Sequence, residues 1–146
     1  MTDPIQAEPG LSPRQFAAIA AFRYELRRFL AFSETAAGAM GLPAQQHQAL
    51  LTIAGHAGPE APSVRTLAEQ LLIAPHTAAE LAARMLDADL LIKTPSAKDR
   101  RRVELALTPR ALGLLERLTS AHLEELRTLE PALTRALGRL ARGDRS

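Results

Sequence analysis

Five basic side chains lie close together between residues 93 and 102, and they are the strongest sign of chemistry in the chain. They are Lys93, Lys98, Arg100, Arg101 and Arg102. Asp99 is the single acid among them, so the local charge is five minus one, or +4. This density suits neutralisation of nucleic-acid phosphates, and a protruding arginine can also enter a narrow minor groove. A solvated charged turn is the alternative, because arginine is used throughout this chain in place of lysine.

The histidines are the other side chains that could carry chemistry. His76 and Glu80 form the only pair with metal-ligand spacing on one helix face, and the other three histidines are scattered. The chain has no cysteine, which excludes disulfides, thiolate metal sites and a cysteine nucleophile. No GxSxG, HExxH or glycine-rich phosphate loop is present. We therefore expect no metal, no cofactor and no enzymatic activity.

The composition describes a chain that can fold around one core. Of the 146 residues, 47% are hydrophobic and 23% are charged, which is typical of one globular domain with helical extensions. The net charge of +2 is too small to indicate a partner by itself. No apolar stretch is long enough to span a bilayer, and Met1 to Gly10 lacks the apolar core of a signal peptide. These features predict a cytoplasmic protein.

Hydrophobic spacing predicts four helices followed by a hairpin. Ser12 caps a first helix that begins with Pro13 and runs to about Ala39. The next three helices cover 45–54, 63–71 and 75–89, and the second of the four buries Leu50, Leu51 and Ile53. The runs 90–94 and 103–107 alternate like strands around the basic connection 95–102. Two short helices before a hairpin predict a winged helix-turn-helix, in a mainly α (α+β) fold.

The two ends of the chain add apolar helices that a winged helix does not need. Helical spacing resumes after Thr108 and Pro109, and Pro131 is expected to break it into two helices. The first helix has apolar residues on more than one stripe, including Phe22 and Phe29. Two-fold dimerisation would bury this surface and would space two DNA-reading helices about one turn of DNA apart. A four-helix pack within one monomer is the alternative.

The fourth helix supplies the candidate base-reading side chains. Ala78, Leu81, Ala82 and Met85 take its inner face by spacing. The outward positions include His76, Thr77, Glu80 and Arg84, with Pro75 at the start. Glu80 repels phosphate unless it accepts from a cytosine amino group. The alternative for Glu80 is a solvated carboxylate that pairs with Arg84, four residues further along the helix.

At these residues the chain resembles the MarR family of bacterial winged-helix transcription regulators. The resemblance extends from Gly41 to Leu118 with the long helices on both sides. The matching motifs are Asp99-Arg100-Arg101, the strand Val103 to Ala106, Leu107-Thr108 before Pro109, Gly41-Leu42 with Gln45-Gln46, and Leu67-Ala68-Glu69. Leu72 and Asp89 stand where the family usually has glycine, which puts the geometry of those two turns in doubt.

The resemblance implies a homodimer that binds a palindromic operator in double-stranded DNA, more often as a repressor. It implies that Arg101 enters the minor groove, while Asp99 either pairs with a neighbouring arginine or caps the turn. It also implies a small aromatic ligand, for which Arg23, Tyr24, Arg27 and His47 are candidates; a solvated face or a structural hydrogen bond is the alternative for each. The implied domains are a flexible tail 1–10, a dimerisation helix 11–40, a DNA-binding domain 41–108 with its wing at 90–107, and dimerisation helices 109–142. A winged-helix module that binds a protein instead of DNA remains the second hypothesis.

Overall fold

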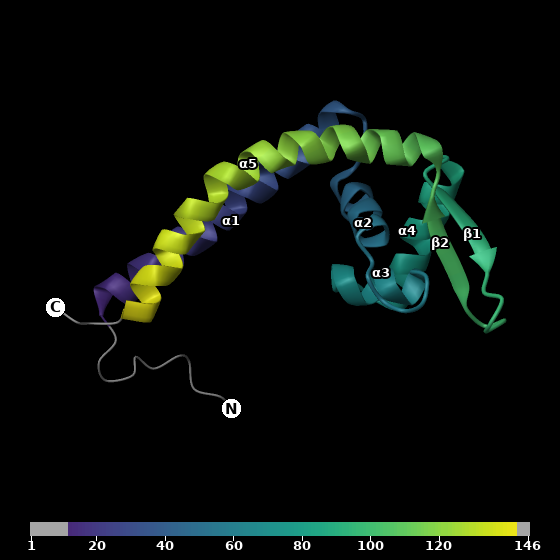
Figure 1. Cartoon of the computed structure of the whole chain (residues 1–146), viewed down its shortest axis with the longest axis horizontal. Coiled ribbons are helices and arrows are strands. Elements are labelled where there is room, and N and C mark those ends of the chain that lie inside the picture. The colour runs from purple at the N-terminus through teal and green to yellow at the C-terminus, as the bar shows by residue number, and fades with distance from the viewer. Residues whose placement is uncertain (1–11, 143–146) are drawn as a thin grey trace. The chain divides into compact units, whose positions relative to one another are not determined.

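The computed structural model describes residues 12–142, which form a mainly helical chain with one small sheet. Its elements are, in order, α1 (Pro13–Ala39), α2 (Ala44–Ala54), α3 (Val64–Leu71), α4 (Pro75–Asp87), β1 (Leu91–Pro95), β2 (Val103–Leu107) and α5 (Pro109–Arg142), as labelled in Figure 1. The predicted winged helix-turn-helix and fold class are confirmed. The expected tail 1–10 and the last four residues, 143–146, lie outside the described part. No helix within residues 12–142 is long and apolar enough to cross a membrane.

The chain separates into two compact units, which we describe one at a time. The central unit is Glu34–Ala121, and the end unit combines the chain up to Ser33 with the chain from His122 onward. The central unit therefore contains α2, α3, α4, the hairpin and the adjoining ends of the two long helices. The end unit contains the remaining parts of α1 and α5.

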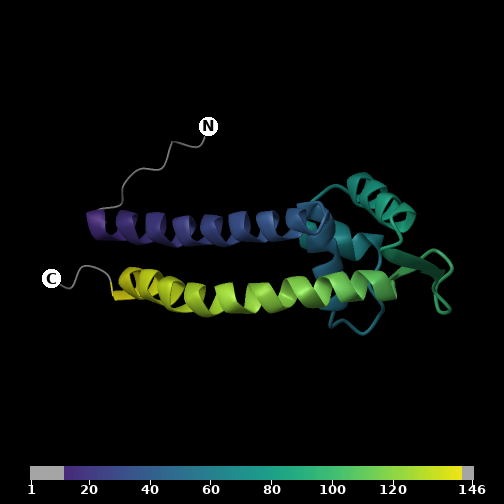
Figure 2. The same ribbon diagram turned by 90° about the horizontal axis from the view of Figure 1, so that it is seen from above.

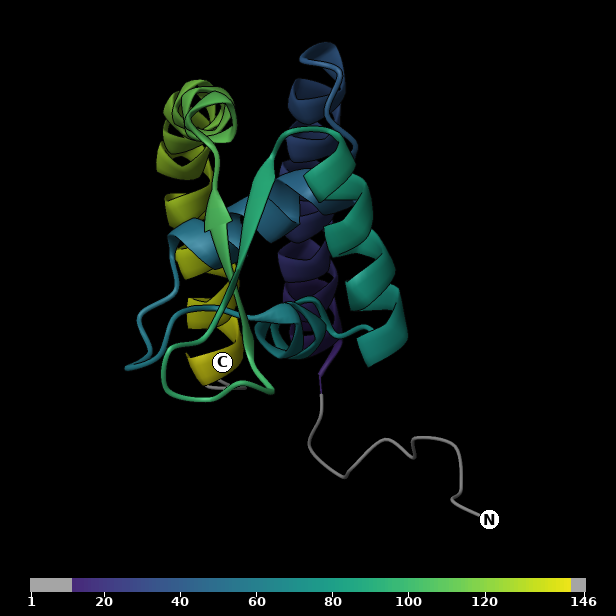
Figure 3. The same cartoon turned by 90° about the vertical axis from the view of Figure 1, so that its right-hand side faces the viewer.

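The central unit closes around its own hydrophobic core. Its largest fully buried apolar side chains are Leu50, Leu67, Met85, Leu105 and Leu118, which come from five different elements. The antiparallel strands pair Leu91 with Leu107 and Pro95 with Val103, and the hairpin packs against α2, α3 and α4 (Figure 3). Pro62 accepts a hydrogen bond from the Leu105 amide at 2.8 Å, so the segment before α3 runs along β2.

One face of α2 differs from the expected one. Leu51 was expected inside but is 43% exposed, whereas His47 is only 2% exposed. The buried positions are His47, Ala49, Leu50 and Ile53, which lie on one side of an α-helix. Leu51 is turned about 100° from Leu50, so a helix that buries the 47–50–53 stripe exposes it. The expectation for Leu51 was therefore wrong.

Three helices of the central unit end in the same way. Just beyond α1, α3 and α4, a backbone amide donates a hydrogen bond to the carbonyl five residues earlier in the chain. The pairs are Leu42 to Ala37, Ile73 to Ala68, and Leu90 to Met85. The residue immediately before each donor has a positive φ, namely Gly41 at 72°, Leu72 at 57° and Asp89 at 58°. This is the Schellman ending, which favours glycine. The turns at Leu72 and Asp89 therefore keep the geometry that glycine would give. Leu72 adopts it at a cost in backbone strain, because a side chain disfavours the left-handed conformation.

The end unit is held by contacts between α1 and α5, which run side by side in Figure 2. The Ser33 hydroxyl and Nε2 of His122 lie 2.8 Å apart in a hydrogen bond. The rings of Phe29 and Phe32 meet the buried His122 ring edge-on, with centroids 5.8 and 5.3 Å away. Among the described residues of this unit, the buried apolar side chains are Ala18, Leu129 and Ala136.

Two expectations about the long helices were wrong. Pro131 was expected to break the C-terminal helix, but α5 continues through it as one helix of 34 residues. Pro131 is exposed, so water can satisfy the carbonyl that its missing N–H leaves open. At the start of α1, Gln15 supplies the cap instead of the Ser12 hydroxyl: its Oε1 accepts from the Ser12 amide at 2.9 Å.

Candidate nucleic-acid interface

Helix α4 presents a polar outer face because its apolar face is buried in the core. Ala78, Leu81, Ala82 and Met85 are buried, as expected. The candidate residues Pro75, His76, Glu80 and Arg84 are exposed, and Thr77 is half-buried. Pro75 occupies the first turn of the helix, where its missing N–H costs nothing. The side chains predicted to read bases therefore project away from the central unit's core.

Glu80 and Arg84 stay apart. No ion pair joins them among the described residues, although i, i+4 spacing permits one. The ion pair on the neighbouring helix α3 does form, between Arg65 Nε and Glu69 Oε1 at 3.1 Å. The exposed carboxylate of Glu80 is therefore available for a partner outside the chain.

The tip of the hairpin is a structured turn. The Ser96 amide donates to the Arg102 carbonyl, and the Arg102 amide donates to the Asp99 carbonyl. The buried Ser96 hydroxyl accepts from the amides of Lys98 and Asp99, both at 3.3 Å. Ser96 was not singled out from the sequence, although a serine three residues before an aspartate at a turn is a usable signal.

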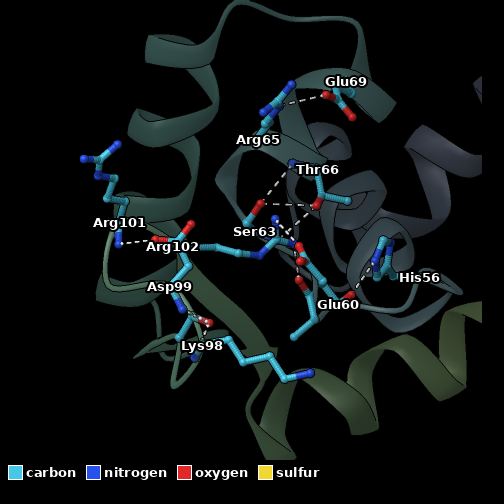
Figure 4. A network of polar contacts seen from close by, with 12 residues as sticks. His56, Glu60, Ser63, Arg65, Thr66, Glu69, Lys98, Asp99, Arg101 and Arg102 are labelled. Carbon is cyan, nitrogen blue, oxygen red and sulfur yellow. Dashed lines mark hydrogen bonds and ion pairs between the residues drawn. The ribbon is translucent and has the colours of Figure 1, made fainter.

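Asp99 acts on the backbone of this turn. Its Oδ1 accepts from the Arg101 amide at 3.0 Å, and it makes no ion pair among the described residues. Of the two roles expected for Asp99, turn capping is the one that the structure contains. The exposed side chains of Lys98, Arg100 and Arg101 extend from the turn that Asp99 fixes, and Figure 4 shows Arg101 pointing away from the rest of the network.

Arg102 differs from its basic neighbours because its side chain turns back toward the central unit. Its Nη1 lies 3.0 Å from Oε2 of Glu60, and its Nη2 donates to the Ala61 carbonyl. The Arg102 side chain is 23% exposed, and its Nε is buried. The wing therefore offers four outward cations, Lys93, Lys98, Arg100 and Arg101, where the sequence suggested five.

A cavity lies beside these residues, between the wing and helices α3 and α4. Its volume is about 590 Å³, and its lining includes Arg65, Ala79, Lys93, Asp99, Arg101 and Arg102. The cavity brings the wing cations next to exposed Arg65 on α3, which the sequence analysis did not select. Charge alone could not have marked Arg65, because basic residues occur along the whole chain.

The four candidate ligand-binding residues fall into different units. Arg23, Tyr24 and Arg27 are exposed on the end-unit part of α1, where the Arg28 guanidinium lies 6.0 Å from the centroid of the Tyr24 ring. His47 is buried within the central unit. The described residues contain no group of three or more side chains suited to hold a metal ion.

The basic wing and the polar face of α4 belong to one compact unit, and the comparisons agree with this arrangement. A sequence model described as MarR family matches residues 40–102. Over this segment, which is less than half of the chain, the sequence is similar to the MarR family. That segment covers α2, α3, α4, β1 and the wing turn as far as Arg102. A search of curated proteins gives no match.

Solved structures of transcription regulators share the fold of this chain. The structure of a Staphylococcus aureus MepR–DNA complex is 20% identical, with a TM-score of 0.67 over 83% of this chain and 88% of that one. AbsC, a MarR family transcriptional regulator from Streptomyces coelicolor, is 18% identical, with a TM-score of 0.69 over 90% and 95%. A MarR transcriptional regulator from Methanosarcina mazei Go1 is 20% identical, with a TM-score of 0.58 over 75% and 78%.

Proposed function

We propose that this protein is a sequence-specific DNA-binding transcription regulator that acts as a homodimer in the cytoplasm, more often as a repressor than as an activator. The observation that carries the proposal is the exposure, on one unit, of the outer face of α4 next to a fixed turn that presents Lys98, Arg100 and Arg101. A helix of this kind fits the major groove, and a basic wing fits the phosphates and the adjoining minor groove.

Each side chain has a definite part in this proposal. Arg101 enters the minor groove, while Lys98 and Arg100 neutralise phosphates. His76, Thr77 and Arg84 face the edges of the bases or the sugar-phosphate backbone. Glu80, which has no ion-pair partner within the described residues, accepts from a cytosine amino group and so selects a C·G pair.

The exposed apolar surface of the end unit supports a dimer. Large hydrophobic side chains there stay roughly half exposed in the single chain: Phe16, Ile19, Leu26, Leu30, Leu123, Leu126 and Leu137. Apolar area of this extent on paired helices favours burial against a second copy. A two-fold dimer places two α4 helices about one turn of DNA apart, which gives a palindrome of roughly 16 to 20 base pairs with half-sites about 10 apart.

A small aromatic ligand is the proposed regulator of DNA binding. Arg23, Tyr24, Arg27 and His47 are the candidate ligand-binding residues, as the family resemblance implies. A ligand that reverses a 99:1 preference between two conformations must bind one of them about 10⁴-fold more tightly, or about 5.5 kcal/mol. Because Arg23 and Tyr24 are proposed to hold the ligand and not the DNA, Arg23→Ala and Tyr24→Ala should weaken the ligand response. Operator binding in the absence of ligand should be unchanged.

The direct test is fluorescence anisotropy of the purified protein on the DNA upstream of its own gene, with a scrambled duplex of equal length as control. At about 0.15 M salt, non-specific binding is no tighter than about 10⁻⁶ M. We expect nanomolar binding to the native fragment at two protomers per site. If random-sequence selection also yields no preferred site, the proposal fails and a winged-helix module that binds another protein replaces it.

A further inference from the structure

The anchor of the wing is a set of contacts that joins two segments far apart in the sequence. Arg102, which begins the second half of the hairpin, reaches the Glu60 carboxylate and the Ala61 carbonyl, 41 positions earlier in the case of Ala61. We call these three groups the Arg102 anchor. Figure 4 shows the Arg102 side chain running inward to Glu60, while the neighbouring Arg101 side chain points the opposite way.

The loop that receives Arg102 is itself held in place. Nε2 of His56 and the Glu60 carbonyl are 2.9 Å apart in a hydrogen bond, which closes the loop between α2 and α3. The Pro62 carbonyl then accepts a hydrogen bond from the Leu105 amide, and the backbones of Ser63 and Glu104 form an isolated antiparallel β-bridge. Ser63 also caps α3 in a reciprocal pair with Thr66. The anchor thus connects the wing turn to a loop that α2 and α3 fix at both ends.

We infer that Arg102 is a positioning residue, which sets the wing for DNA from a place where it does not touch DNA. Its guanidinium is occupied by two acceptors from the loop, and its side chain is 23% exposed beside the outward cations of the turn. The Arg102 backbone holds the same turn, through its amide to Asp99 and its carbonyl to Ser96. An arginine fixed at both ends in this way restrains the direction in which Arg100 and Arg101 project.

The inference rests on the proposed DNA binding, and it reverses the simple electrostatic expectation for Glu60. An acidic residue near a DNA-binding surface repels phosphate, so its removal should tighten binding. If Glu60 holds the anchor, its removal should weaken binding instead. Glu69 provides a matched control, because it pairs with Arg65 at 3.1 Å and its side chain is 63% exposed, against 3.0 Å and 62% for Glu60.

The experiment compares Glu60→Gln, Glu69→Gln, Arg102→Met and the Glu60→Gln/Arg102→Met double variant on a selected operator. We expect Glu60→Gln and Arg102→Met each to weaken binding severalfold, a modest loss because the Glu60 side chain is 62% exposed and its ion pair is screened by solvent. The double variant should lose no more than Arg102→Met alone, because both changes break the same contact. Glu69→Gln should bind as the wild type does or slightly more tightly.

The salt dependence of binding distinguishes positioning from direct contact. Loss of one phosphate contact reduces the magnitude of the negative slope of log K against log salt by about 0.9, so binding becomes less dependent on salt. Arg100→Met should show this decrease, whereas Arg102→Met should keep the wild-type slope. Arg102→Lys should recover only part of the affinity, because an ammonium retains the charge but cannot match the planar fork. Tightening by Glu60→Gln together with a lower slope for Arg102→Met would overturn the inference.

A measurement without DNA separates this inference from the proposed function. In the free protein, hydrogen exchange at the Arg102 and Leu105 amides should speed up roughly tenfold in Arg102→Met and in Glu60→Gln, and should be unchanged in Glu69→Gln. Unchanged exchange in both anchor variants would overturn the positioning role even if the protein binds DNA. If the wild type binds no DNA sequence, the proposed function fails, and faster exchange still supports the anchor as a support of the wing.

Discussion

The central unit and the end unit use helices of the same residue types in opposite ways. In the central unit, leucines and alanines from every element meet in one core, and most of its large apolar side chains are buried or partly buried. In the end unit, α1 and α5 touch around His122 but leave leucines exposed on both helices, together with Phe16 on α1. The central unit is therefore complete in the sense that it closes its core within a single chain, whereas the end unit leaves most of its large apolar side chains at least partly exposed.

The largest expected effect comes from placing charge on the end unit. Leu30→Glu combined with Leu126→Glu puts four carboxylates into each proposed dimer interface, where unpaired charge is very costly. The dimer dissociation constant should rise more than about a thousandfold, which corresponds to about 4 kcal/mol. Sedimentation velocity should report a monomer. Leu72→Glu, at a site 91% exposed in the central unit, is the control and should remain a dimer.

A cavity in the central core should cost less than that but should not depend on protein concentration. Leu67 is fully buried, so Leu67→Ala should lower the free energy of unfolding by about 3 kcal/mol in urea titrations. Leu137→Ala, in the end unit, should destabilise the protein only at concentrations where it is dimeric. Equal concentration dependence for the two variants would contradict the division into a complete and an incomplete unit.

A smaller effect should follow from loss of the outward arginine of the wing. Arg101→Ala should reduce operator affinity by about 1 to 3 kcal/mol without unfolding the protein, because its side chain makes no ion pair among the described residues. Arg28→Ala removes the same charge from the end unit and should change affinity little. Anisotropy at matched salt measures both, and equal losses would show that the wing has no special part in DNA binding.

The smallest expected effect is a gain in stability. Leu72 holds a left-handed backbone conformation with its side chain 91% exposed, so Leu72→Gly relieves a strain of about 1 kcal/mol at little loss of packing. The urea midpoint should rise. Asp89→Gly at the equivalent turn should gain less, since aspartate tolerates this conformation better than leucine. A lower midpoint for Leu72→Gly would show that its side chain contributes contacts that outweigh the strain.

The sequence predicted most of the elements because each rests on local signals. Ser63 and Thr108 mark helix starts, and the Thr108 hydroxyl accepts from the Ala111 amide at 3.1 Å as a cap should. The change of period after residue 89 located the hairpin. The inner and outer faces of α4 also followed from spacing alone.

The details that the sequence did not predict depend on contacts between distant residues. Nothing in the run of three arginines distinguishes Arg102 from Arg101, because Glu60 and Ala61 lie in another loop. The burial of His47 in place of Leu51 depends on which side of α2 the core meets. Proline breaks helices in general, but the exposed position of Pro131 in the long helix α5 tolerates it.

The Arg102 anchor has a consequence for any transfer of the wing to another winged-helix protein. A wing transplanted as residues 90–107 alone would arrive without the Glu60 and Ala61 acceptors that orient it. Its arginines would then project from a less ordered turn. In this chain the hairpin must therefore be transferred together with the loop before α3. The smallest segment that can keep the wing oriented is thus made of two stretches that are separate in the sequence.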